Sequence, residues 1–165
     1  MSGYISHLPI CQIVRMSEPT IRPIGHVEDT PVIRRVGKRN LYLGNEHAAD
    51  PGQHDQSFRY VLSLSTNDHP LTTHHHPLND GSGNDWTEFE AAVETARRLS
   101  RRDCPVLIHC KAGISRSSTV IATALAAEES RPLHDALSAV LQARPSATPN
   151  PALHELAVIY LAARM

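Results

Sequence analysis

The stretch "PVLIHCKAGISRSS", residues 105–118, holds the most informative local pattern in the chain. An apolar run leads into a His-Cys pair, and a glycine, an arginine and two serines follow. The apolar run predicts a buried strand that ends at Cys110, and the Ala-rich sequence after it predicts a helix. A short connection from strand to helix can aim successive backbone N–H groups into one concavity. The helix N-terminus adds about half a positive charge there.

The side chains of this stretch suit phosphoryl transfer. Gly113 permits a backbone turn that a Cβ atom would obstruct. Arg116 offers a planar guanidinium that can bind two phosphate oxygens. Cys110 lies at the base of this positive cradle, which favours the nucleophilic thiolate over the thiol. The pattern therefore predicts a site in which a thiolate attacks phosphorus while N–H groups and a guanidinium bind the phosphate oxygens.

This stretch resembles the signature loop of the cysteine-dependent protein tyrosine phosphatases: His-Cys, five residues, Arg, then Ser or Thr. Within that superfamily "HCKAGISRS" is most similar to the dual-specificity phosphatases. Four further segments resemble, in order, the family's opening strand, a central strand, the general-acid loop and the link between the last two helices: "NLYLGN", "YVLSLS", "PLNDG" and "ARPSATPN". The resemblance extends from about Val36 to the C-terminus and implies the tyrosine phosphatase fold.

The resemblance implies a role for each residue of the loop. Cys110 would form a phosphocysteine, and Arg116 would bind the phosphoryl group in the ground and transition states. Ser117 would hydrogen-bond the sulfur and help it leave. His109 would order the loop and support the thiolate without acting as its base. The phosphate would be bound by the loop residues Lys111, Ala112, Gly113, Ile114, Ser115 and Arg116.

The general acid is expected about thirty residues before the cysteine, as in the family. Asp80 precedes Cys110 by 30 residues and Asp85 by 25. Asp85 is expected to cap the following helix, with Glu88 completing a capping box. Asp80 is therefore the predicted acid, and the later base for the attacking water. The alternative is that Asp80 only forms a turn, since Asn-Asp-Gly is turn chemistry.

The predicted architecture is α/β, with a central, mostly parallel sheet flanked by helices. Strands are expected within residues 31–36, 40–45, 58–65, 71–78 and 105–110, with a further short strand at 21–26. Helices are expected within 85–99, 117–130, 131–144 and 150–164. Ser130 precedes the third helix, and Asn150 caps the fourth. We expect residues 31–165 to form the catalytic domain and residues 1–30 to be an extension of unknown role.

Composition narrows the function classes. The 165-residue chain has a net charge of −1, whereas proteins dedicated to nucleic acid or membrane surfaces usually show a basic face. It contains neither an apolar run of membrane-spanning length nor a secretory signal pattern. Three cysteines, at 11, 104 and 110, make no disulfide framework, so we expect a cytoplasmic protein. Whether Cys11 or Cys104 has a redox role stays open.

The histidine run at residues 74–76 suggests a metal site as one alternative. Strand alternation would send His74 and His76 to one face and His75 to the other. Because no Cys or carboxylate stands at ligand spacing from them, a structural role or a role at the substrate rim is favoured. The predicted chemistry requires neither a metal nor another cofactor.

The leading hypothesis is a phosphatase that hydrolyses phosphotyrosine in proteins, with phosphoserine and phosphothreonine as further candidates. Its expected partner is a phosphoprotein or phosphopeptide, with no membrane or nucleic-acid partner. The same chemistry on a phosphoinositide or an RNA 5′-phosphate is an alternative. Lys111 is the only lysine in the loop and Ile114-Ser115 are neutral, which disfavours the lipid. An inactive phosphate-binding module is a third hypothesis, disfavoured because Cys110 and Arg116 are both present.

Overall fold

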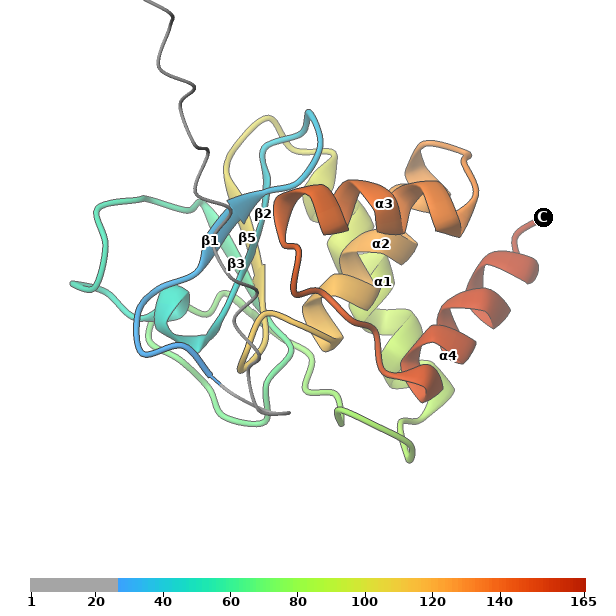
Figure 1. Ribbon diagram of the computed structural model, residues 1–165, viewed down its shortest axis with the longest axis horizontal. Coiled ribbons are helices and arrows are strands. Elements are labelled where there is room, and N and C mark those ends of the chain that lie inside the picture. Colours follow the sequence, from blue (N-terminus) through green and yellow to red (C-terminus); the bar gives the residue numbers. More distant parts are fainter. Residues whose placement is uncertain (1–26) are drawn as a thin grey trace, which may run out of the picture.

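The computed structural model describes residues 27–165, and its five strands form one sheet in the order β1-β2-β5-β3-β4 (Figure 1). The strands are β1 (Ile33–Arg35), β2 (Leu41–Gly44), β3 (Tyr60–Ser63), β4 (His74–His75) and β5 (Val106–His109). Strands β1 and β2 pair antiparallel, and the other three pairings are parallel. The predicted mostly parallel sheet is therefore confirmed. The strand expected at 21–26 lies outside the described residues, as does Cys11.

Strand β5 occupies the middle of the sheet. All four of its residues, Val-Leu-Ile-His, are buried. Ile108 pairs with Leu43 of β2 on one side and with Leu62 of β3 on the other. A continuous apolar run is typical of a parallel strand that is covered on both faces. The central position of β5 places the residue that follows it, Cys110, inside the molecule.

All four α-helices lie on one side of the sheet, and α1 and α2 pack directly against its strands (Figure 1). They are α1 (Trp86–Ser100), α2 (Arg116–Glu128), α3 (Leu133–Ala143) and α4 (Pro151–Ala162). Helix α2 packs against the other three and is buried from Arg116 to Ala126. Its Ala, Ser and Thr side chains are small enough to let three neighbouring helices approach. No helix of the described chain has the length and hydropathy to cross a membrane.

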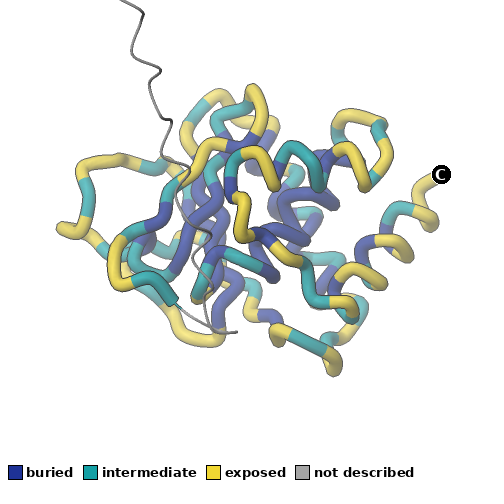
Figure 2. The backbone as a smooth tube through the Cα atoms, in the orientation of Figure 1, coloured by how far each residue is buried: buried dark blue, intermediate teal, exposed yellow. Residues whose placement is uncertain are grey.

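The other face of the sheet is covered by a 3-10 helix, η1 (Glu46–Ala49). Ala48 and Ala49 of η1 pack on Val61 and Leu107, which point away from the α-helices. The buried residues lie along the sheet and where the helices contact one another, whereas the outer loops are exposed (Figure 2). The strand that leads to Cys110 is thereby held between two apolar layers.

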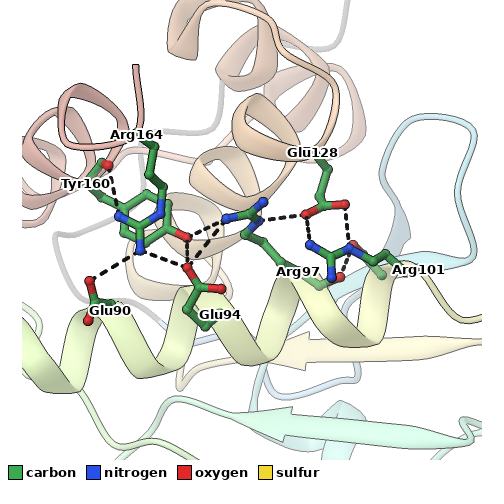
Figure 3. Close-up of polar contacts among 8 residues, drawn as sticks. Glu90, Glu94, Arg97, Arg101, Glu128, Tyr160 and Arg164 are labelled. Atoms are coloured by element: carbon green, nitrogen blue, oxygen red, sulfur yellow. Dashed lines mark hydrogen bonds and ion pairs between the residues drawn. The ribbon is translucent and has the colours of Figure 1, made fainter.

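A network of arginines and glutamates joins α1 to α2 and α4 (Figure 3). Arg97 donates from Nε to Glu128 at 2.6 Å and from Nη1 to the Tyr160 hydroxyl at 3.0 Å. That hydroxyl donates to Glu94. Hydrogen bonds from Arg101 and Arg97 lower the pKa of Glu128 to about 2, so this carboxylate is charged at neutral pH. The network links α1 to the last turn of α2 and to the C-terminal part of α4, whereas Cys110 precedes the first turn of α2.

The start of α4 agrees with the prediction, whereas the start of α3 does not. Helix α4 follows Asn150, whose side chain accepts a hydrogen bond from Ala152 N–H at 3.0 Å, so the predicted cap is confirmed. Helix α3 begins at Leu133, later than predicted, and Pro132 is the residue before it. A proline disfavours the helical conformation in the residue before it. Ser130 has a φ of 48° and lies in the turn between the helices, not at the helix start.

Candidate active site

The residue after β5 and the first turn of α2 face each other across the signature loop, residues 110–116. Cys110 is 2% exposed, and its Sγ lies 3.2 Å from Oγ of Ser117. The backbone N–H of Cys110 donates to Gly44 O at 3.4 Å, which ties the loop to the end of β2. The structure therefore brings the predicted nucleophile and its predicted hydrogen-bond donor into contact.

The signature loop holds its carbonyl groups outward. Four consecutive carbonyl oxygens accept hydrogen bonds from outside the loop: Lys111 from Glu46 N–H at 3.0 Å, Ala112 from Arg144 Nη2 at 3.3 Å, Gly113 from Arg144 Nε at 3.2 Å, and Ile114 from Thr148 N–H at 2.9 Å. In a trans peptide the carbonyl group and the N–H of the following residue point in opposite directions. The N–H groups of residues 112–115 therefore point to the inner side of the loop.

These inward N–H groups have no hydrogen-bond acceptor in the described chain. None of the N–H groups of residues 112–115 donates to another described residue. Gly113 and Ser115 are buried, where N–H groups are almost always paired, so unpaired N–H groups turned to one side of the loop indicate an anion-binding nest. The N-terminus of α2 faces the same place, with no acidic residue in its first turn. The loop is thus built to bind an anion.

Two glycines are required around the end of β2: Gly113 lets the loop approach β2, and Gly44 leaves room for Ala48 and Leu107. Gly113 has a φ of +66°, and a Cβ atom there would lie 3.0 Å from Gly44 O. A Cβ atom on Gly44 would lie 2.8 Å from side-chain atoms of Ala48 and Leu107. The need for glycine at position 113 follows from the sequence pattern. The matching need at position 44 was missed, because in the sequence Gly44 looks like an ordinary strand end.

Arg116 is the first residue of α2, and its side chain is largely buried. Its Nη1 donates to Leu78 O at 3.1 Å and to Leu64 O at 3.5 Å. Its Nε is buried and has no partner among the described residues. A guanidinium that is anchored on one side, with a buried unpaired N–H on another, is suited to an acceptor that the protein itself does not supply. A phosphate oxygen fits this requirement.

His109 is fully buried, and burial lowers its pKa to about 4. Its Nδ1 lies 3.4 Å from Cys110 O and its Nε2 lies 2.5 Å from Oγ of Ser63. A carbonyl oxygen can only accept, so Nδ1 carries the proton and Nε2 accepts from Ser63. His109 is therefore neutral at pH 7. Any support it gives to Cys110 comes from orientation of the loop, not from positive charge.

The predicted general-acid loop is braced by Asn84. Its Oδ1 accepts from Asn79 N–H at 2.7 Å, and its Nδ2 donates to Asn79 O at 3.0 Å and Gly81 O at 3.1 Å. Asp80 is exposed within this loop, and its carboxylate accepts no hydrogen bond from a described residue. Its backbone oxygen accepts from Asn150 Nδ2 at 3.4 Å.

Asp85 differs from its predicted role. It precedes α1 as expected, but its side chain makes no capping hydrogen bond. The expectation that backbone N–H groups hold its carboxylate is therefore wrong. A different observation favours Asp80: Leu78 O binds Arg116, and Asn150 bonds both Asp80 O and, through its N–H at 2.9 Å, Oγ of Ser115. Residues 78–80 are tied to the signature loop on two sides, whereas no such contact joins Asp85 to it in the described chain.

Each of the three histidines at 74–76 contacts a different residue. His74 lies 2.9 Å from Thr73 Oγ1, His75 Nε2 donates to Ser65 O at 2.8 Å, and His76 lies 3.0 Å from Thr95 Oγ1. Within residues 27–165 no three His, Cys, Asp or Glu side chains gather as metal ligands. The expectation of a metal-free, cofactor-free mechanism stays a prediction.

Two hollows on the described surface lie away from the loop. A groove of about 850 Å³ lies between α2, α3 and α4 and includes Leu133, Val158 and Leu161. A smaller one, of about 260 Å³, includes His76 and Thr87. No residue of the signature loop lines either hollow. The site is identified by the chemistry of its groups and not by the size of a cavity.

The sequence from residue 41 to residue 160 matches the family described as dual specificity phosphatase, catalytic domain. The chain belongs to this family. The matched range includes the whole signature loop and both candidate acids, so the predicted family membership is confirmed. Membership of the dual specificity phosphatase family also explains why the chain has the α/β fold described above.

Relatives and solved structures of this family agree with the match. Dual specificity protein phosphatase OPG106 of vaccinia virus (strain Western Reserve) is 32% identical over 103 residues, which are 58% of this chain and 60% of the viral protein. Dual specificity protein phosphatase 19 of Mus musculus is 37% identical over 67 residues, 41% of this chain and 30% of the mouse protein. The crystal structure of human DUSP28 has a TM-score of 0.70 and 26% identity, and covers 82% of this chain and 98% of that one. The chain spans less than two thirds of either relative found by sequence.

Proposed function

We propose that the protein is a cysteine-dependent phosphatase that hydrolyses phosphotyrosine in proteins through a phosphocysteine intermediate. The observation that carries the proposal is the arrangement of the signature loop: four carbonyl groups bonded outward, four N–H groups pointing inward, and Cys110 at the base. Such a cradle matches a phosphoryl group, whose nonbridging oxygens need hydrogen-bond donors while phosphorus is attacked from below.

In the first step the thiolate of Cys110 attacks phosphorus, and the bond from phosphorus to the substrate oxygen breaks. The electron pair of that bond stays on the leaving oxygen, which takes a proton from Asp80. Inward N–H groups and Arg116, through its unpaired Nε, bind the nonbridging oxygens. These donors are already in place, so they stabilise the transition state without rearrangement.

In the second step a water molecule attacks phosphorus, and the phosphorus–sulfur bond breaks. The Asp80 carboxylate takes a proton from the water, and inorganic phosphate leaves. The sulfur departs as a thiolate, and the Ser117 hydroxyl at 3.2 Å is positioned to donate to it. Atoms and charge balance over the two steps without a metal or a redox reagent.

Protein substrates are proposed on two grounds. The relatives named above are protein phosphatases, and the loop itself adds only one lysine to the site. Lys111 is exposed, and Ile114 and Ser115 later in the loop are neutral, so the loop lacks the cluster of positive charge that suits a polyphosphorylated lipid. Phosphoserine and phosphothreonine peptides are proposed as further substrates.

The deciding assay compares phosphotyrosine, phosphoserine and phosphothreonine peptides with phosphoinositides and 5′-phosphorylated RNA, by kcat/KM. We expect the highest value for a phosphotyrosine peptide. Cys110→Ser should abolish turnover and retain substrate binding, because an alcohol is a far weaker nucleophile than a thiolate while the cradle survives. A Cys110→Ser variant that still turns over substrate would place the chemistry elsewhere. A higher kcat/KM for the lipid or the RNA would change the substrate class.

A further inference from the structure

Arg144 braces the signature loop from behind. It follows the last residue of α3, and it is 5% exposed. One edge of its guanidinium hydrogen-bonds the loop: Nε donates to Gly113 O at 3.2 Å and Nη2 donates to Ala112 O at 3.3 Å. These two carbonyl groups set the direction of two of the inward N–H groups. Arg144 therefore shapes the anion-binding surface without reaching it.

The remaining nitrogen of Arg144 contacts Glu28. Nη1 lies 3.3 Å from Oε1 of Glu28, and both side chains are substantially shielded, at 6% and 20% exposed. Glu28 is the only carboxylate of the described chain in an ion pair with Arg144. A buried guanidinium costs free energy unless a charge partner is present, and two peptide carbonyls do not supply a charge. Glu28 therefore compensates the charge that holds the loop.

The contact also has a geometric consequence. The three nitrogen atoms of a guanidinium lie in one plane and form a rigid fork. A carboxylate bound at Nη1 restricts the rotation of that plane, and so directs Nε and Nη2 at the two loop carbonyls. Without the carboxylate, the plane is held by the two carbonyls alone.

We propose that Glu28 is a positioning residue for the phosphate-binding loop, acting through Arg144. The inference rests on the proposed function to the extent that the loop binds phosphate. Glu28 lies within residues 1–30, the expected N-terminal extension. This segment would therefore contribute to the catalytic site. The order of the loop thus depends on how the chain is placed just before the first strand.

A purely electrostatic role for Glu28 predicts the opposite sign of effect. Neutralising a carboxylate near an anion site would tighten phosphate binding, and added salt would screen the change. Loss of positioning would weaken phosphate binding, and salt would matter little because the contacts within the loop are shielded. The direction of the change therefore separates the two roles.

The test measures the Kd of inorganic phosphate by calorimetry, together with the amide signals of Gly113 and Ile114 in the NMR spectrum of the full chain. Glu28→Gln should weaken phosphate binding roughly three- to tenfold and shift both amide signals. Glu28→Asp should recover part of the affinity. The matched control is Glu129→Gln, which removes two ion pairs, with Arg39 and with Arg131, at the end of α2 opposite to the loop. It should leave the Kd unchanged.

A double variant tests the route through Arg144, and it uses Glu28→Asp, which keeps the charge, if Glu28→Gln is too unstable to measure. Arg144→Lys retains the charge and loses the fork, and adding either Glu28 substitution to it should weaken phosphate binding no further. Unchanged or tighter binding in Glu28→Gln, or additive effects in the double variant, would overturn the inference. If the wild-type protein does not bind phosphate, the proposed function fails. Phosphate binding that is indifferent to residue 28 rejects only the positioning role.

Discussion

The sulfur of Cys110 lies 3.2 Å from the hydroxyl oxygen of Ser117, one residue into the helix that follows the loop. The contact joins the two ends of the signature loop. It also places a donor at the atom that would carry negative charge when the proposed phosphocysteine breaks down. The two reaction steps should therefore respond differently to loss of this hydroxyl.

Ser117→Ala should slow breakdown of the phosphoenzyme more than its formation, because only the second step expels the sulfur. We expect kcat to fall roughly ten- to a hundredfold, a size typical of a lost hydrogen bond to a charged group. Rapid-quench kinetics should show a burst and accumulation of labelled phosphoenzyme. The matched control is Ser118→Ala, since the Ser118 hydroxyl is buried with no partner among the described residues. Equal effects of the two variants would contradict the assignment.

Asp80→Asn should lower kcat/KM for a tyrosyl phosphate about 10²–10⁴-fold, because the leaving oxygen then departs without a proton. A nitrophenyl ester, which has a better leaving group, should be affected less. Asp85→Asn should retain most of the rate. Because the Asp85 side chain caps nothing, it should change the free energy of unfolding by less than about 0.5 kcal/mol. The assignment is wrong if Asp85→Asn, and not Asp80→Asn, removes the acid limb of the pH–rate profile.

Gly113→Ala should reduce both stability and activity. Its positive φ disfavours a Cβ atom, and that atom would also press on Gly44 O at 3.0 Å. Gly52→Ala is a matched control, since Gly52 has a φ of +84° but nothing within 4 Å of the added Cβ. Chemical denaturation should show a loss of about 1 kcal/mol for Gly52→Ala from backbone strain alone, and more for Gly113→Ala. Activity should fall only in the latter, and equal stability losses would argue against the close contact.

The free energy of unfolding should fall as the pH is lowered from about 6.5 toward 4, in part through His109. Its pKa is lowered from 6.5 to about 4 in the folded protein. The unfolded chain therefore takes up a proton at a pH where the folded chain does not, which favours unfolding. A shift of this size corresponds to about 3 kcal/mol. His109→Gln lacks this titration, so urea unfolding at several pH values should show a shallower dependence. Identical slopes would contradict the burial argument.

The parts of the site that the sequence predicts are those that depend on neighbours in the chain. A strand, a turn and a helix start within one short stretch, so the placement of Cys110, Gly113 and Arg116 follows from spacing and residue type alone. The predicted sheet is confirmed for the same reason. Its three central strands, β2, β3 and β5, are short and mostly buried runs that the sequence marks locally, and parallel pairing restricts how they connect.

The rest depends on contacts between distant parts of the chain. Ser63 reaches His109 across the β3–β5 pairing, and Arg144 approaches the loop from the far end of α3. Both residues lie in segments that the sequence marks, but no local pattern predicts these contacts. The error at Asp85 has a related cause: residue type and position at a helix start favour a capping bond, but the actual side-chain orientation depends on the surrounding loop, which Asn84 braces.

The outward direction of the loop carbonyls means that the catalytic surface is supported by residues that a substrate never meets. Glu46 and Thr148 each supply one backbone N–H, from η1 and from the link between α3 and α4. A change that locally unravels either segment would release one carbonyl and let its peptide plane rotate. An activity assay would then show a loss like that of an active-site substitution, although every reacting group is intact. Genetic variants in these two supports are therefore to be judged by anion affinity as well as by melting temperature.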